Sequence, residues 1–120
     1  MLNYKSAGQG EKQIIFIHGN SQSGETWEMI MENNDLREKY KLIAMDLPGH
    51  GNSFHSKEPQ NDYSVFGLAN ALKDFISGLN NKEYILVGNS LGANLIGEIA
   101  MDLVNCKGIM LVGSSAVGTK

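Results

Sequence analysis

The chain has 120 residues and a mass of 13.1 kDa, which is enough for one domain and too little for two. Ten Lys and Arg residues against thirteen Asp and Glu give a formal net charge of −3, so the basic surface needed to bind nucleic-acid phosphates is not expected. One cysteine, no apolar N-terminal segment and no apolar run near the roughly 20 residues that span a bilayer predict a cytoplasmic protein without disulfides or membrane contact.

Short apolar runs alternate along the chain with segments of helical periodicity. The runs are Ile14–Ile17, Leu42–Met45, Tyr84–Val87 and Gly108–Val112. Each is continuous rather than alternating, which is typical of strands in a parallel sheet that is covered on both faces. We also expect a short edge strand over Leu2–Ala7, paired through the Gly8-Gln9-Gly10 turn.

Three amphipathic helices are predicted between these strands. The first covers about Glu25–Lys39, with Trp27, Ile30, Met31 and Leu36 on one face. The second presents Leu68, Leu72, Phe75, Ile76 and Leu79, and the third presents Leu91, Leu95, Ile96, Ile99, Ala100 and Leu103. Strands that alternate with helices predict an α/β fold: a mainly parallel sheet flanked by helices.

In such a sheet the chemistry gathers at the carboxyl ends of the strands, where the third strand runs into Gly88-Asn89-Ser90-Leu91-Gly92. This is a G-x-S-x-G sequence between a strand and a helix, the setting of a nucleophile elbow. The glycines allow a sharp turn that lifts the Ser90 hydroxyl from the sheet beside a helix N-terminus, where the Leu91 N–H can donate to an oxyanion. The alternative is a glycine-rich turn in which Ser90 only caps the helix.

The first strand ends in His18-Gly19-Asn20. Gly19 permits a sharp turn after which the Asn20 N–H would supply a second oxyanion donor. His18 directly follows the strand, and we expect it to order its own loop by hydrogen bonds rather than act as a base.

The second strand ends in Asp46-Leu47-Pro48-Gly49-His50-Gly51-Asn52-Ser53. Asp46 and His50 offer a carboxylate and a base, but we expect them to hold this loop together. His55 lies in a polar stretch and is expected to be solvated.

Together these three motifs resemble the α/β-hydrolase superfamily, in its esterase, lipase-like and carbon–carbon-bond hydrolase branch. The resemblance runs from about Leu2 to Val112, implies the α/β-hydrolase fold, and identifies residues 1–120 as the N-terminal part of one such domain, truncated after the strand at about 108–112. It implies that Ser90 is the nucleophile and that the Asn20 and Leu91 N–H groups form the oxyanion hole. The implied reaction is hydrolysis of a small-molecule carboxylic ester or related acyl bond through an acyl-serine intermediate. No cofactor or metal is called for.

Members of this superfamily carry an acid and then a histidine after the serine. Here only Glu98 and Asp102 are acidic after Ser90, and no histidine follows it. We therefore expect the catalytic acid and histidine to be missing from this chain. The alternatives are an inactive binding or assembly module and a site completed by another subunit.

Three further expectations concern surfaces and single residues. The strand at 108–112 should have an unpaired apolar edge that favours self-association. Trp27 and Phe54 either line part of an acyl pocket or pack under a loop. Cys106 is expected on or just after a helix, partly buried, and the histidines lack the spacing of metal ligands.

Overall fold

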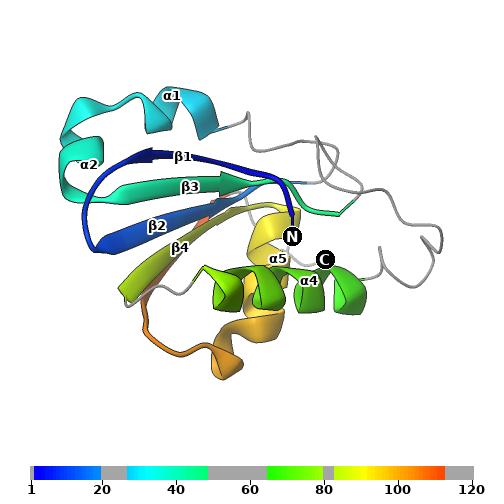
Figure 1. Ribbon diagram of the computed structural model, residues 1–120. Coiled ribbons are helices and arrows are strands. Elements are labelled where there is room, and N and C mark those ends of the chain that lie inside the picture. Colours follow the sequence, from blue (N-terminus) through cyan, green and yellow to red (C-terminus); the bar gives the residue numbers. More distant parts are fainter. Residues whose placement is uncertain (1, 20–26, 49–64, 80–82, 113–120) are drawn as a thin grey trace.

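The computed structural model describes residues 2–19, 27–48, 65–79 and 83–112 (Figure 1). Its elements are β1 (Tyr4–Gly8), β2 (Lys12–Ile17), α1 (Glu28–Met31), α2 (Asn34–Lys39), β3 (Lys41–Met45), α4 (Val65–Gly78), β4 (Glu83–Asn89), α5 (Leu91–Ile99), the 3-10 helix η2 (Ala100–Asp102) and β5 (Cys106–Val112). Within these ranges, no helix combines the length and the apolar character that a membrane crossing requires.

The described strands form one sheet in the order β1-β3-β2-β4-β5. Strands β2 to β5 are mutually parallel, and β1 alone runs antiparallel, against β3. Helices α4 and α5 cover one face of the sheet, and α1 and α2 lie on the other (Figure 1). The predicted α/β class with a mainly parallel sheet is confirmed, and each of the four apolar runs lies inside a strand.

The edge position of β1 is as predicted, but its pairing is not. The strand pairs with β3 instead of turning back onto the next strand in sequence. Gly8 and Gly10 adopt φ values of +82° and +132°, and the turn packs against the end of α2, where the Gln9 N–H donates to the Arg37 carbonyl at 2.9 Å. Because α2 leads directly into β3, the bond between Gln9 and Arg37 places β1 beside β3, on its outer side.

The single helix expected over about Glu25–Lys39 is two short helices in the described range from residue 27 onward. Asn33 takes an extended conformation, and its side-chain oxygen accepts a hydrogen bond from the Leu36 N–H at 3.0 Å. Asparagine is a favoured helix cap, so the chain stops α1 here and starts α2. Trp27 and Met31 are buried as predicted, whereas Ile30 is 40% exposed.

Helices α4 and α5 agree with the predicted periodicity. Their buried side chains are Leu68, Leu72, Phe75 and Ile76 on α4 and Leu95, Ile96 and Ile99 on α5. These side chains join Ile15, Ile17, Ile43, Met45 and Leu86 of the sheet in one core cluster. Cys106 is half-buried as expected, but it begins strand β5 instead of following a helix directly.

The two edges of the described sheet differ in chemistry. On β1, Lys5 pairs with Glu28 at 2.6 Å, and charge of this kind discourages further strand pairing. On β5, Ile109, Met110, Leu111 and Val112 are each between 43% and 59% exposed. An apolar outer edge at β5 is therefore present as predicted, while self-association through it stays a prediction.

Helix α5 starts in close contact with the end of β2. A Cβ atom at Gly92 would meet the Ile17 carbonyl oxygen and would lie 2.8 Å from that of His18. At Gly97, five residues further along the same helix, a Cβ would meet nothing within 4 Å. The first turn of α5 thus tolerates no side chain, whereas the later turn does.

We predict opposite stability effects for Gly92→Ala and Gly97→Ala, measured by urea unfolding of the full-length protein. Gly92→Ala should lower the free energy of unfolding by about 1–3 kcal/mol, because backbone oxygens cannot yield to the new methyl group. Gly97→Ala should raise it by about 0.5–1 kcal/mol, because alanine costs less entropy than glycine inside a helix. Equal effects of the two substitutions would contradict the close approach.

Candidate functional site

Ser90 joins the carboxyl end of β4 to the first residue of α5. Its backbone has φ 54° and ψ −110°, a conformation that residues with a side chain rarely adopt. Two main-chain hydrogen bonds hold it there: the Ser90 N–H donates to the Val112 carbonyl at 3.0 Å, and the Ser90 carbonyl accepts from the Asn94 N–H at 3.1 Å. The strain is thus offset by bonds to the neighbouring strand and to the helix.

Glycines on either side make this turn sterically possible. A Cβ at Gly88 would lie 2.6 Å from Cδ1 of Ile96 and 2.8 Å from the Ala93 nitrogen. Gly92 lies against the end of β2, as described above. The residues two before and two after Ser90 therefore have no room for a side chain, which is the physical reason for the G-x-S-x-G spacing.

The Ser90 hydroxyl does not cap α5. Ser90 occupies the N-cap position, but its side chain makes no capping hydrogen bond, so the capping-serine alternative does not describe this turn. The residue is partly exposed. The first N–H groups of a helix have no partner within the helix, and Leu91 is the first residue of α5. A partly exposed serine whose side chain makes no capping bond therefore lies at the N-terminal turn of a helix.

His18 is fully buried, and both of its ring nitrogens lie against main-chain atoms. Nε2 accepts a hydrogen bond from the Leu47 N–H at 2.9 Å, and Nδ1 lies 2.7 Å from the Gly19 carbonyl oxygen. Because an amide N–H only donates and a carbonyl only accepts, the proton must be on Nδ1 and the ring must be neutral. In this arrangement neither nitrogen is available to take a proton from Ser90.

Asp46 directly follows β3 and is 5% exposed. Its carboxylate accepts a hydrogen bond from the Asn3 side-chain amide at 2.9 Å, and its N–H donates to the Asn3 carbonyl at 2.8 Å. Asp46 thereby ties the segment before β1 to the end of β3. Sequence reasoning missed Asn3, because no local signal marks a partner 43 residues away.

Trp27 packs against Phe16 on the α1 face of the sheet. The two ring centroids are 5.1 Å apart, and the indole is 6% exposed. Trp27 belongs to the core cluster on this face of the sheet, and its role in an acyl pocket stays a prediction. The other predicted site residues, namely Asn20, His50 and Phe54, lie outside the described residues, as does His55.

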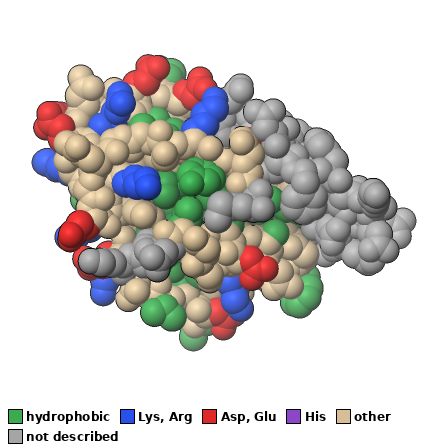
Figure 2. All heavy atoms as spheres, in the orientation of Figure 1, with side chains coloured by type: hydrophobic (Ala, Val, Ile, Leu, Met, Phe, Trp, Pro, Cys, Tyr) green, Lys and Arg blue, Asp and Glu red, His purple; other side chains and the backbone are tan. Residues whose placement is uncertain are grey.

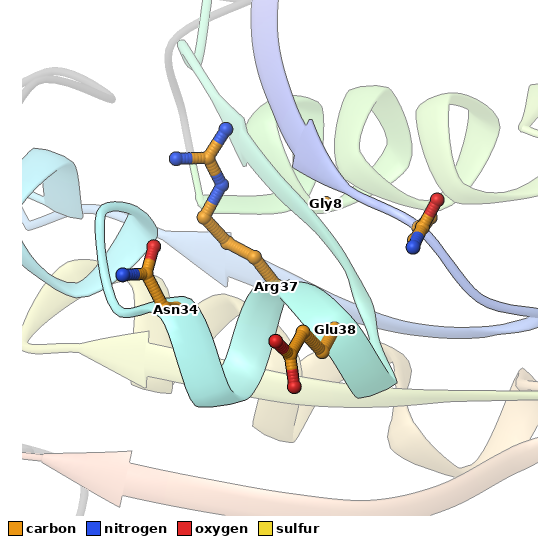
Figure 3. A pocket seen from close by; sticks show the side chains of 5 residues that line it. Gly8, Asn34, Arg37 and Glu38 are labelled. Carbon is orange, nitrogen blue, oxygen red and sulfur yellow. The ribbon is translucent and has the colours of Figure 1, made fainter.

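Cavities lined by described residues include three near the amino ends of the parallel strands, whereas Ser90 lies at their carboxyl ends. One, of about 420 Å³, is lined by Gly8, Gln9, Asn34, Arg37 and Glu38 between the end of β1 and α2 (Figure 3). Two others, of about 260 and 280 Å³, share Tyr84 near the start of β4. Burial, together with the nearby Cys106, raises the pKa of the Tyr84 phenol above its usual value.

Charged side chains are mixed in sign on the face shown in Figure 2. Among the described residues on this face, acidic and basic groups are interspersed and form no extended basic region. Across the described ranges, no group of three or more His, Cys, Asp and Glu side chains is placed to hold a metal ion.

A family model and several known proteins match this chain, and the matches agree on one family. The family model described as "alpha/beta hydrolase fold" matches residues 12–119. An uncharacterised protein of Mycobacterium tuberculosis is 35% identical over 81% of this chain and 27% of its own length. A monoacylglycerol lipase of Xenopus laevis is 31% identical over 81% of this chain and 29% of its own length.

Solved structures agree with this match. N-acyl homoserine lactonase AidH, in complex with N-butanoyl homoserine, superimposes with a TM-score of 0.83 and 31% identity over 92% of this chain and 40% of its own. Other matched proteins include a methyl ester esterase and a thioesterase domain. This chain spans between about a quarter and two fifths of the length of the relatives named here. With its parallel sheet, its strained strand–helix turn and the family match over most of its length, the chain belongs to the α/β-hydrolase fold family.

Proposed function

We propose that the protein is a serine hydrolase that cleaves a carboxylic ester, or a related acyl bond, with Ser90 as its nucleophile. The observation that carries this proposal is the strained turn at Ser90, a partly exposed residue whose side chain does not cap the helix that follows. Strain of this kind persists only where surrounding contacts impose it, and it concentrates at functional sites. Membership of a family whose matched members include an esterase, a lipase and a lactonase supports the proposed reaction class.

In the proposed mechanism, the Ser90 Oγ attacks the acyl carbon while a general base takes its proton. The carbonyl oxygen becomes an oxyanion, which accepts hydrogen bonds from the N–H groups of Leu91 and Asn20. Collapse of this tetrahedral intermediate expels the alcohol, which takes the proton from the base, and leaves an acyl-serine. Water then attacks the same carbon by the same steps, releases the acid and restores the serine hydroxyl.

The general base in this proposal is not His18, because both of its ring nitrogens are bonded to main-chain groups. No histidine follows Ser90 in the sequence, whereas the superfamily's order places an acid and then a histidine there. We therefore infer that the catalytic acid and histidine are supplied by residues outside these 120. The greater length of the relatives supports this inference.

The substrate in this proposal is a small molecule with an ester, thioester or lactone group. The named relatives include a monoacylglycerol lipase, a methyl ester esterase and a homoserine lactonase, and an acyl group is the feature that those substrates share. A cytoplasmic location fits the sequence and is proposed with it. The competing proposal is an inactive binding module, in which the Ser90 turn would be kept without catalysis.

We predict that Ser90→Ala in the full-length protein lowers kcat for p-nitrophenyl acetate and p-nitrophenyl butyrate by about 10⁴-fold or more, because the acyl-enzyme can no longer form. The exposed Ser77 of α4 provides a matched control, and Ser77→Ala should keep the wild-type rate. Turnover that survives in Ser90→Ala would contradict the mechanism. A full-length wild-type protein that hydrolyses neither ester nor any thioester or lactone would favour the binding module.

A further inference from the structure

We propose that His18 is a positioning residue. Its ring fixes the orientation of the Gly19 carbonyl, which follows β2, relative to the end of β3. The inference rests on the proposed function, because what His18 positions is the peptide that leads into the oxyanion hole. It acts through main-chain groups and does not touch the substrate.

The ring of His18 continues the pairing of two strands beyond the point where their backbones stop pairing. The β2–β3 ladder ends at the parallel pair Ile17 and Met45. One residue further on, the side chain of His18 reaches the Leu47 N–H at 2.9 Å. The imidazole therefore replaces a ladder bond where the strands give way to the loops that carry the site motifs.

The same ring controls the first peptide of the loop that follows β2. With Nε2 accepting from Leu47, Nδ1 must carry the proton, and it donates to the Gly19 carbonyl at 2.7 Å. A carbonyl and the N–H that follows it point in opposite directions across a trans peptide. A bond that fixes the Gly19 carbonyl would therefore also fix the direction of the N–H that we propose as the second oxyanion donor.

The position of His18 also links this loop to the Ser90 turn. The His18 carbonyl oxygen is one of the atoms that leave no room for a side chain at Gly92. The backbone of His18 thus lies under the first turn of α5, while its ring, fully buried, reaches the end of β3. One residue contacts all three segments whose relative placement sets the geometry of the proposed oxyanion hole.

The test uses three variants in the full-length protein, because each removes a different hydrogen bond. His18→Asn places an amide near the Nδ1 position and keeps the donor to Gly19. His18→Gln places its amide near the Nε2 position and keeps an acceptor for Leu47. His18→Ala removes both. The readouts are kcat and KM for p-nitrophenyl butyrate, the inhibition constant of a boronic acid that mimics the tetrahedral intermediate, and the melting temperature.

A positioning role predicts a loss in kcat with little change in KM. His18→Ala and His18→Gln should lower kcat by about 10²-fold, near the cost of one lost oxyanion donor, and should weaken boronic acid binding in proportion. His18→Asn should recover kcat to within about tenfold of wild type. Leu72→Ala controls for destabilisation alone, since Leu72 is fully buried in the α4 core cluster, which does not include His18. It should lower the melting temperature and leave kcat unchanged.

Two results would overturn the inference while the proposed function stands. One is that Ser90→Ala abolishes turnover but folded His18→Gln keeps the wild-type kcat. The other is that kcat falls in step with the melting temperature in all three His18 variants and in Leu72→Ala alike. Destabilisation alone would then explain the loss of activity. If Ser90→Ala itself keeps activity, the proposed function fails, and the positioning role that rests on it fails as well.

Discussion

The start of helix α5 lies against the end of β2 with no side chain between them, and the candidate site depends on that contact. Gly92 packs on the carbonyl oxygens of Ile17 and His18, and Gly88 packs on the first turns of the same helix. Because the helix cannot move away from the sheet, the chain must pass from β4 into α5 within one residue. That residue is Ser90, and its left-handed backbone is the geometric consequence. The same packing that completes the core therefore places a hydroxyl at the carboxyl ends of the strands.

Hydrogen bonds at this end of the sheet connect the strands after their ladders stop. His18 bonds to Leu47, the Asp46 carboxylate accepts from Asn3, and the Ser90 N–H donates to Val112. Each bond satisfies a polar group beside an otherwise apolar core, where an unsatisfied group would cost about 1–3 kcal/mol. Each also fixes the starting direction of a loop that carries one of the sequence motifs. Stability and the placement of the site therefore rest on the same interactions at this end of the strands, and a substitution such as His18→Ala should affect both.

The features that could be predicted from the sequence are those with a local cause. Continuous apolar runs such as Ile14–Ile17 identified the buried parallel strands, apolar spacing identified α4 and α5, and the paired glycines around Ser90 identified the turn. The features that were missed depend on distant partners or on a competing local signal. The pairing of β1 with β3 depends on a contact between Gln9 and Arg37, and the burial of Asp46 depends on Asn3. The break between α1 and α2 does have a local signal, the capping Asn33. We predicted one continuous helix there because the apolar spacing continues across Asn33.

The most direct test of the central claim, that packing forces strain on Ser90, compares Ser90→Gly with Ser90→Ala in urea unfolding of the full-length protein. Glycine adopts this backbone conformation at little cost, whereas alanine keeps the Cβ that makes it unfavourable. The account predicts that Ser90→Gly is more stable than Ser90→Ala by about 1–3 kcal/mol, the usual cost of such a conformation. Equal stability of the two variants, or a more stable Ser90→Ala, would contradict it.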